Sequence, residues 1–317
     1  MRAPAKISAA LDALASRTGR VRIICLGLSA LDLIWRVDRL FTGQSEKIKS
    51  LDHTTLGGGM AANAAVTIAR LGASVAFWGR GGADAAGQEM RAAFETAGVD
   101  IEHFRLFEEG RSSVSGIIVD KSGERQIVNF RGLYPEAADW LPLDQVSRAS
   151  AVLADPRWVE GAAALFDKAR ALGIPTVLDG DMADAEVFER LLPLSDHAVF
   201  SEPALASFAG SASDDALSAL ARFGCRVIAV TRGGDGVSWY ENGCLHRQAA
   251  YAVDVADTTG AGDVFHGAYA LAIGAGLDAR DAMAFAAATA ALKCTHSGGR
   301  VGIPSINDSL AFMRTDP

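Results

Sequence analysis

The sequence predicts an α/β fold, a doubly wound, mostly parallel sheet with helices on both faces. Residues 21–27 form an apolar run interrupted only by Arg22, which is typical of a parallel strand buried on both sides. Segments with the strand pattern then alternate with helical segments along most of the chain. Glycine-rich turns at 57–59 and 260–262 lead into two of these helices. In such a fold, ligands bind outside the carboxyl ends of the strands.

The elements follow one another in a regular order. Residues 60–71 are predicted to form a helix opened by three glycines, and residues 74–79 the next strand. Residues 84–97 are predicted to form a helix that ends at Gly98, a residue suited to a helix C-cap. The later elements are strands at 151–154, 176–179, 197–200 and 226–231, and long helices at 261–275 and 278–295.

Two segments break this alternation, at about 33–56 and 113–131. In the second segment, the residues from Val114 to Val119 alternate between the two faces of a strand. A turn at 121–124 and a returning strand to Phe130 follow, which indicates a hairpin. Extra strands inserted at two points can meet as a small second sheet. The alternative is a hairpin that only decorates the surface.

Composition limits the classes of function. The 317 residues are 50% hydrophobic, enough for one large domain at 21–317 after an N-terminal extension at 1–20. The net charge of -8, without a basic cluster, argues against a nucleic-acid partner. The extension has no signal-peptide core, and the apolar stretch 264–276 is too short to span a membrane. Four scattered cysteines without CxxC spacing indicate a reduced, cytoplasmic protein.

The run Asp257-Thr258-Thr259-Gly260-Ala261-Gly262-Asp263 is the most informative motif. At the start of a helix, the successive N–H groups of Gly260, Ala261 and Gly262 can point at one anion, such as a phosphate. Asp263 beside a phosphate would repel it, so its expected role is to take a proton from an attacking hydroxyl, as the general base of a phosphoryl transfer. The alternative is a helix start with an acidic residue in its first turn.

A second motif reads Gly57-Gly58-Gly59-Met60-Ala61-Ala62-Asn63-Ala64-Ala65, followed by Ile68-Ala69-Arg70-Leu71-Gly72. It resembles the N-terminal signature of the ribokinase-type (PfkB) carbohydrate kinases, and the Asp257–Asp263 run resembles their C-terminal one. The segment 231–236 is similar to their nucleotide loop. This resemblance, over about 21–304, implies a ribokinase-like fold whose small β-sheet is a lid over the sugar and the contact of a homodimer.

The resemblance extends to the sulfofructose kinases of sulfosugar breakdown, on the segments 153–158, 177–181, 194–203, 291–295, 298–300 and 302–304. It implies ATP-dependent phosphorylation of the carbon-1 hydroxyl of 6-deoxy-6-sulfofructose. Lys47, Asn129 and Arg157 match the positions that hold the sulfonate in that group. A guanidinium, an ammonium and an amide suit a permanent monoanion with three acceptor oxygens. The alternative for each residue taken singly is a solvated charged side chain or an amide on the face of a strand.

Four residues are candidates for the sugar itself. Asp32, just beyond the first strand, can accept two hydroxyls, although a turn-capping Asp is the alternative. Gly58 and Gly59 would let the backbone approach the sugar closely. Asn63, in the first turns of the next helix, can donate to and accept from a diol, and its alternative is an exposed helix residue.

The resemblance also assigns residues to ATP. Thr231, Gly233 and Gly236 match the family's loop near the phosphates, and Ala288 and Thr295 match the region that lines the adenine, although an Ala-rich helix is also simply close-packed. Where relatives carry Asn-x-x-Glu, which helps to organise Mg²⁺, this chain reads Ser201-Glu202-Pro203-Ala204. The metal ligands are therefore unknown, with Asp179, Asp181 or Glu202 as substitutes. Asp257, near the predicted anion site, resembles a residue of a monovalent-cation site.

Several other functions stay open on the sequence. A kinase for fructose, tagatose 6-phosphate, ribose or a nucleoside would keep Asp263 without needing Lys47, Asn129 and Arg157. A phosphosugar is the main rival, because phosphate resembles sulfonate. A non-catalytic sugar sensor is disfavoured by the intact motif. A nicotinamide oxidoreductase is disfavoured because no G-x-G-x-x-G follows the first strand.

Overall fold

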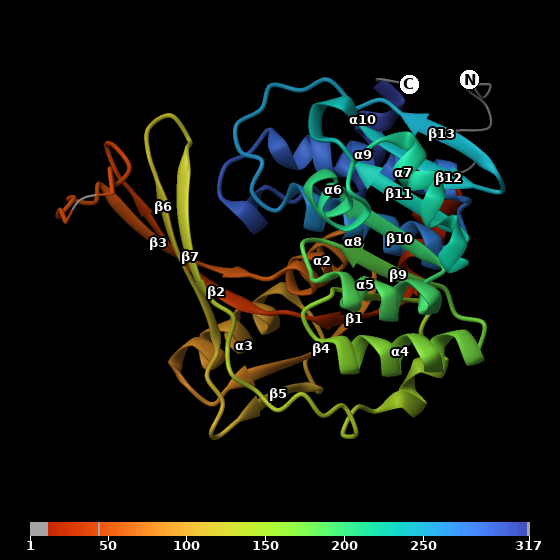
Figure 1. Cartoon of the computed structure of the whole chain (residues 1–317), viewed down its shortest axis with the longest axis horizontal. Helices are drawn as coiled ribbons and strands as arrows, with labels where there is room; N and C mark the ends of the chain where they lie inside the picture. Colours follow the sequence, from red (N-terminus) through yellow and green to blue (C-terminus); the bar gives the residue numbers. More distant parts are fainter. Residues whose placement is uncertain (1–11, 44, 316–317) are drawn as a thin grey trace.

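The computed structural model describes residues 12–43 and 45–315, and within them the strands form two sheets (Figure 1). The large sheet has the order β13-β12-β11-β10-β9-β8-β1-β4-β5. Its strands from β11 to β5 are parallel, and the β12–β13 hairpin adds two antiparallel strands at one edge. The bounds are β1 (Arg22–Gly27), β4 (Ser74–Gly82), β5 (Phe104–Phe107), β8 (Ala151–Ala154), β9 (Thr176–Gly180), β10 (His197–Ser201), β11 (Val227–Thr231), β12 (Val237–Glu241) and β13 (Cys244–Gln248).

Helices cover both faces of this sheet (Figure 1). Successive residues of a strand point to opposite faces, so Ile23 and Cys25 of β1 pack in one buried cluster and Ile24 and Leu26 in the other. The first cluster includes residues of α2 (Met60–Arg70), α3 (Ala85–Ala97), α8 (Ala261–Gly274), α9 (Ala279–Cys294) and α10 (Ile306–Thr315). The second includes residues of α4 (Val159–Ala171), α5 (Ala185–Leu191), α6 (Glu202–Ala209) and α7 (Asp214–Ala219). The doubly wound prediction is confirmed.

Side-chain caps set several of the helix boundaries. The Asp84 carboxylate accepts a hydrogen bond from the Gly87 N–H at 2.8 Å and begins α3. Gly98 ends the same helix with φ +74°, the left-handed conformation that glycine adopts without strain. Asp278 caps α9 through the Asp281 N–H at 2.9 Å. These boundaries fall within a few residues of the predicted ones.

The two inserted segments meet as a small four-stranded sheet of order β3-β2-β6-β7. Its strands are β2 (Ala30–Arg36), β3 (Asp52–Gly58), β6 (Ser113–Val119) and β7 (Arg125–Phe130). The central β2–β6 pair is parallel and the outer pairs are antiparallel. The small sheet stands at one side of the main domain (Figure 1), and the predicted second sheet, in place of a decorative hairpin, is confirmed.

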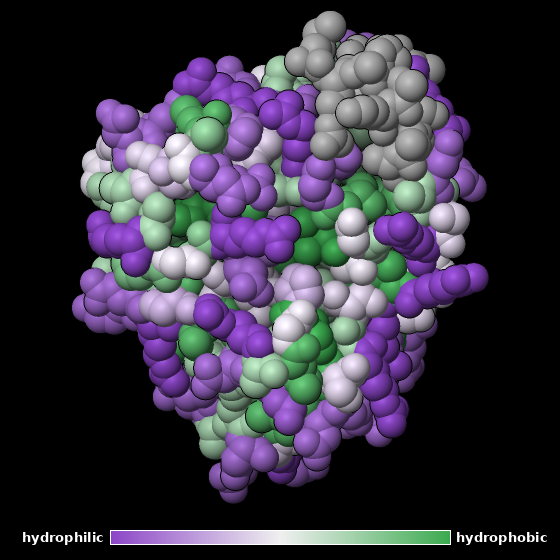
Figure 2. Space-filling model, turned by 90° about the vertical axis from the view of Figure 1, so that its right-hand side faces the viewer, coloured by the Kyte–Doolittle hydropathy of each residue, from purple (hydrophilic) through white to green (hydrophobic). Residues whose placement is uncertain are grey.

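The rest of the surface adds little to the question of function. Residues 12–17 are helical, and the predicted N-terminal extension otherwise lies largely outside the described residues. Figure 2 shows the side away from the small sheet, where apolar side chains occur in groups between polar ones. Among the described residues, none of the helices is both long and apolar enough to cross a membrane.

Candidate active site

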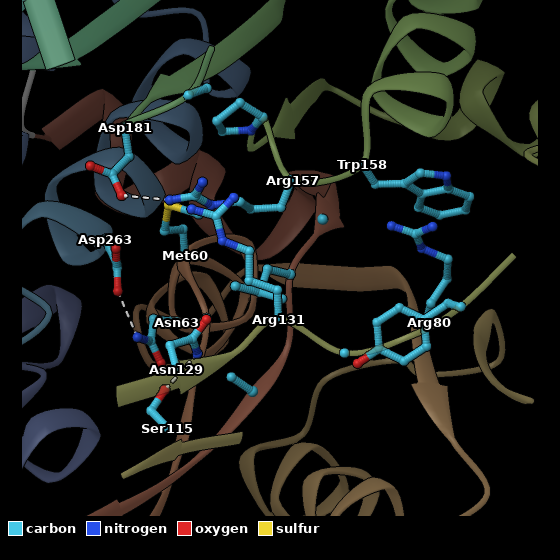
Figure 3. Close-up of a pocket in the computed structure, with 18 of the residues that line it drawn as sticks. Met60, Asn63, Arg80, Ser115, Asn129, Arg131, Arg157, Trp158, Asp181 and Asp263 are labelled. Carbon is cyan, nitrogen blue, oxygen red and sulfur yellow. Dashed lines mark hydrogen bonds and ion pairs between the residues drawn. The ribbon is translucent and has the colours of Figure 1, made fainter. Parts of the chain in front are cut away.

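A pocket of about 810 Å³ opens where the small sheet faces the carboxyl ends of the central strands (Figure 3). Its lining comes from the loop after β1, from β2, β6 and β7, from the loops after β8 and β9, and from the starts of α2 and α8. Five of the residues predicted for the sugar line it together with the predicted base, namely Asp32, Gly59, Asn63, Asn129 and Arg157 with Asp263. Fold topology therefore brings together residues that lie over 200 positions apart.

Asp263 begins a chain of hydrogen bonds across the floor of the pocket. The Asn63 Nδ2 group donates to Asp263 Oδ2 at 2.6 Å (Figure 3). The Asn63 Oδ1 atom in turn accepts from Arg300 Nε at 2.7 Å, and Arg300 Nη2 donates to the Gly58 carbonyl at 3.3 Å. Because Arg300 can only donate, the orientation of the Asn63 amide is fixed, and its NH₂ group must face Asp263.

The pKa of Asp263 is raised to about 8, chiefly by burial and also by the neighbouring Asp179 carboxylate, although the Asn63 hydrogen bond lowers it. A carboxyl group with a pKa near neutrality is a better proton acceptor than an ordinary aspartate. This is the range that general-base catalysis favours.

A buried histidine lies behind the base. The two ring nitrogens of His266 lie 2.7 Å from the Gly262 carbonyl and 3.0 Å from the Val199 carbonyl. Both oxygens only accept, so both contacts are hydrogen bonds only in the imidazolium form. The Nδ1 atom is also 3.4 Å from Asp179 Oδ2, an oxygen that has no hydrogen-bond partner within the described part of the chain. Burial raises the pKa of Asp179 well above its ordinary value.

The start of α8 is open in front of its amides. Gly260 has φ +73°, and a Cβ added at Gly262 would meet no atom within 4 Å. The structure differs from expectation at Ala261, whose N–H donates to the Thr258 carbonyl at 3.1 Å. Among the described contacts, the N–H groups of Gly260, Gly262 and Asp263 stay available to an anion.

The glycines before α2 leave space that neighbouring protein groups occupy. A Cβ at Gly58 would lie 2.1 Å from Asp32 Oδ2, and one at Gly57 would lie 2.2 Å from Arg300 Nη1. Gly59 has φ +94°, and its Cβ would lie 2.3 Å from the Leu28 carbonyl oxygen. These glycines let Asp32 and Arg300 stand against the backbone at the edge of the pocket. Burial raises the pKa of Asp32, while a hydrogen bond to Ser115 and the charge of Arg300 lower it.

Three residues form a polar group on another side of the pocket. Asn129, on β7, donates to Ser115 Oγ at 3.1 Å. Arg157 follows β8 and lies 3.6 Å from the Asp181 carboxylate. Arg131, just after β7, lines the same pocket, and its guanidinium points towards that of Arg157 (Figure 3). Two guanidinium groups and an amide are therefore available to an anionic group of a ligand.

Lys47 does not take part in this arrangement. It is exposed on the long connection between β2 and β3 and is not among the residues that line the pocket. In the single chain Lys47 is therefore not grouped with Asn129 and Arg157, and its role toward the anion stays a prediction. Arg131, which sequence reasoning missed, is the second cation there.

Arg80, also missed, is held in the wall of the pocket. Its guanidinium lies 4.3 Å from the centroid of the Trp158 ring and 5.4 Å from that of Tyr134. Its Nη1 group donates to the Pro135 carbonyl at 2.9 Å. No local motif assigned a role to Arg80, Arg131, His266 or Arg300, since their partners lie far away in the sequence.

The residues predicted for the nucleotide lie elsewhere, and none of them lines this pocket. Thr231 ends β11, and a Cβ at Gly236 would lie 2.1 Å from the Gln248 carbonyl oxygen. Gly233 has φ +54° and open space before it. Ala288 is fully buried in the core, so its side chain packs against other core residues, and Thr295 donates to the Leu292 carbonyl at 2.7 Å.

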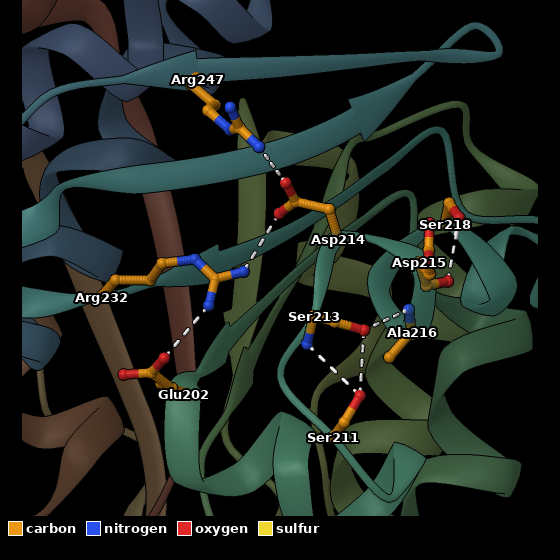
Figure 4. Close-up of polar contacts among 9 residues, drawn as sticks. All are labelled: Glu202, Ser211, Ser213, Asp214, Asp215, Ala216, Ser218, Arg232 and Arg247. Carbon is orange, nitrogen blue, oxygen red and sulfur yellow. Dashed lines mark hydrogen bonds and ion pairs between the residues drawn. The ribbon is translucent and has the colours of Figure 1, made fainter.

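The acidic residues considered for a metal differ in their availability. Glu202 pairs with Arg232 at 3.1 Å, and Arg232 also pairs with Asp214 at 3.2 Å (Figure 4). Asp181 lines the pocket, whereas Asp179 is buried behind it. Among the described residues there is no cluster of three His, Cys, Asp or Glu able to hold a metal ion alone. Asp179 Oδ2, which has no hydrogen-bond donor among the described residues, and Asp181 are the carboxylates that could hold a Mg²⁺ together with phosphates and waters.

The comparisons with known proteins agree with one another. Residues 21–306 match the model of the pfkB family carbohydrate kinases. The chain is 28% identical over 284 residues to the ribokinase of Haemophilus influenzae, covering 86% of this chain and 92% of the other. It is 34% identical over 232 residues to a fructokinase of Klebsiella pneumoniae, covering 66% and 74%.

Solved structures extend the likeness to the whole fold. The crystal structure of a candidate ribokinase from Agrobacterium tumefaciens has a TM-score of 0.88 and 36% identity, covering 93% of this chain and 98% of that one. The family model covers well over half of the sequence, and the fold and the motifs agree with it. The chain belongs to the pfkB family of carbohydrate kinases, phosphotransferases with an alcohol group as acceptor.

Proposed function

We propose that this kinase phosphorylates the carbon-1 hydroxyl of 6-deoxy-6-sulfofructose and forms 6-deoxy-6-sulfofructose 1-phosphate. The observation that carries the proposal is the presence of Arg157, Arg131 and Asn129 in the same pocket as Asp263. This pocket suits a substrate with a hydroxyl at one end, which would face Asp263, and a permanent anion at the other end, which would face the two arginines and Asn129. The family membership supports the kinase chemistry, and the fructokinase likeness supports a ketose.

Asp263 is the proposed general base. The sugar hydroxyl would give its proton to the Asp263 carboxylate while the oxygen attacks the γ-phosphate of ATP. The N–H groups of Gly262 and Asp263 at the start of α8 would hold the phosphate oxygens. Asn63 would keep the carboxylate aimed at the hydroxyl, and Asp32 would accept hydrogen bonds from other sugar hydroxyls.

Thr231, Gly233 and Gly236 are proposed to border the nucleotide, with Thr295 near the adenine. Asp181, with Asp179 behind it, would hold Mg²⁺, which when bound would neutralise charge on the phosphates. The small sheet is proposed to exclude water from the reaction. Its strand β7 already contacts the turn before α8, since Arg125 Nη1 donates to Thr259 Oγ1 at 3.1 Å.

The charge of the pocket favours a sulfonate over a phosphate. A sulfonate carries one negative charge, whereas a phosphate monoester carries about -1.5 to -2 at neutral pH. Arg157 is paired with Asp181, and Arg80 donates to a backbone carbonyl in the wall of the pocket. Of these three arginines, only Arg131 has no protein acceptor among the described contacts. A dianion in an acidic protein of net charge -8 would need more cations than this.

The test is an ADP-release assay with a sugar panel of 6-deoxy-6-sulfofructose, fructose, fructose 6-phosphate, tagatose 6-phosphate and ribose. We expect kcat/KM to be at least ~10-fold higher with sulfofructose than with the others, a difference of about 1.4 kcal/mol. A higher value with a phosphosugar would identify a phosphoketose kinase, and a higher value with ribose would identify a ribokinase. Either result would refute the proposed substrate and leave the kinase class intact.

We also propose a homodimer formed through the small sheet. All residues of β7 are exposed; Ile127 faces the pocket, and Val128, which is 75% exposed, lies on the opposite face of the strand. A second copy of this chain would cover that apolar residue. Sedimentation analysis should give a dimer for the wild type and a monomer for Val128→Asp. A monomeric wild type would contradict the proposal.

A further inference from the structure

A lysine is buried directly beside the turn that leads into α8. The Lys293 side chain, near the end of α9, has 0% exposure. Its Nζ group donates to the Asp257 carbonyl oxygen at 2.9 Å and lies 3.9 Å from Asp257 Oδ2. A buried ammonium is costly unless its charge is compensated, and here Asp257 supplies both the acceptor and the opposite charge.

Asp257 is itself fixed on both sides by the backbone. Its Oδ1 atom accepts from the Thr259 N–H at 2.9 Å and its Oδ2 atom from the Gly298 N–H at 3.2 Å. The Asp257 N–H donates to the Cys294 carbonyl at 3.1 Å. The carboxylate thus joins the end of α9 to the turn that continues through Thr258 and Gly260 into the phosphate-facing start of α8.

In this geometry the Lys293 ammonium occupies the position that a monovalent cation beside Asp257 would take. Such an ion would need the Asp257 carbonyl and carboxylate oxygens, which already face the Lys293 ammonium. Two positive charges within a few Å in a buried region repel each other strongly. We infer that Lys293 is a built-in cation that replaces an exchangeable monovalent ion, so that the kinase needs none. The inference does not depend on which sugar is the substrate.

The ammonium is placed to act on the reaction through the turn. It holds the Asp257 carbonyl and carboxylate in position, and these groups in turn fix the path of the turn that leads to Gly260. It also adds a fixed positive charge near the site proposed for the phosphates, in a region where water does not screen it. Lys293 is thus a positioning residue that does not touch the reacting atoms.

The experiment compares the wild type with Lys293→Met, a neutral side chain of similar length, and uses Lys168→Met on α4 as the surface control. All proteins are freed of alkali ions and kept in tetramethylammonium salts, and K⁺ is added at constant ionic strength. The readouts are turnover with the best sugar of the panel and the unfolding midpoint without sugar. Circular dichroism establishes that Lys293→Met is folded.

We expect K⁺ to change wild-type and Lys168→Met turnover by less than ~2-fold. Lys293→Met should lose at least ~10-fold without K⁺ and recover much of that loss with K⁺. Its unfolding midpoint should rise with K⁺ concentration, while that of the wild type should not, because only the variant has an ion to bind.

Three outcomes would overturn the inference. Activation of the wild type by K⁺ of ~5-fold or more would show that an exchangeable ion binds despite Lys293. Full turnover of Lys293→Met without K⁺ would show that no cation is needed there. A folded Lys293→Met that stays slow in every salt would show that the ammonium and the ion are not interchangeable. If Lys293→Met does not fold, the wild-type response to K⁺ decides alone.

Discussion

The Asn63 amide donates to the Asp263 carboxylate at 2.6 Å and accepts from Arg300 at 2.7 Å, so one side chain links α2, α8 and the loop after α9. This link fixes the direction of the carboxylate without giving it a full counter-charge, since an amide is neutral. If Arg300 paired directly with Asp263 in place of Asn63, its positive charge would hold the pKa of Asp263 low and make the carboxylate a weaker base. The arrangement orients Asp263 and leaves its pKa near 8.

Replacing Asp263 by Asn should remove the base and retain the shape of the site. We expect turnover to fall by at least ~10²-fold, as is usual when a general base is lost, with nucleotide binding unchanged. Steady-state assays and titration with ADP measure the two effects. Asp167→Asn, exposed on α4, is the matched control. Near-normal turnover of Asp263→Asn would contradict the assignment of the base.

The pH dependence of kcat/KM should report the raised pKa of Asp263. Because the deprotonated form is the active one, kcat/KM should rise with pH and level off above an apparent pKa near 8. The Asn63 hydrogen bond lowers this pKa, so Asn63→Ala should move the rise to higher pH. A rise centred near pH 4, the ordinary value for an aspartate, would show that Asp263 is not perturbed.

The same raised pKa has a consequence for stability. Between about 4 and 8 the folded protein keeps a proton on Asp263 that the unfolded chain has lost, so the free energy of unfolding falls as pH rises through this window. Asp263→Asn removes that dependence. The unfolding midpoint of the variant relative to the wild type should therefore increase from pH 5 to pH 9, by about 2 °C or more. An unchanged difference would mean that the carboxylate is not desolvated.

The sequence could predict the fold because each element carries its own signal, such as the apolar run of β1 or the Asp84 cap and Gly98 end of α3. It could also predict that Asp263 and Asn63, which lie in local motifs, are found in one pocket. It could not predict Arg131, Arg300 or His266, whose environments come from contacts with distant segments. Similarity of position along the chain did not by itself bring the Lys47 side chain into the pocket of the single chain.

The two guanidinium groups of the pocket should act on the anionic end of the substrate alone. We expect Arg157→Ala and Arg131→Ala each to lower kcat/KM with sulfofructose by ~10- to 100-fold, since a charged hydrogen bond contributes ~1.5–3 kcal/mol. Turnover of unsubstituted fructose should barely change. The exposed Arg148→Ala serves as the control and should have little effect. Equal losses on both sugars would assign the arginines to the fold of the site instead.

Sulfonate and phosphate can be separated by pH, because only phosphate changes its charge near neutrality. Fructose 6-phosphate approaches a monoanion at pH 5.5 and is nearly a dianion at pH 8, while sulfofructose stays at one negative charge. Asp263 serves both substrates, so its own titration cancels in the ratio of the two kcat/KM values. If the pocket is built for a monoanion, fructose 6-phosphate should gain on sulfofructose as the pH falls from 8 to 5.5. A ratio that stays flat over this range, or a preference for the phosphate at pH 8, would refute the sulfonate proposal and favour a phosphosugar kinase.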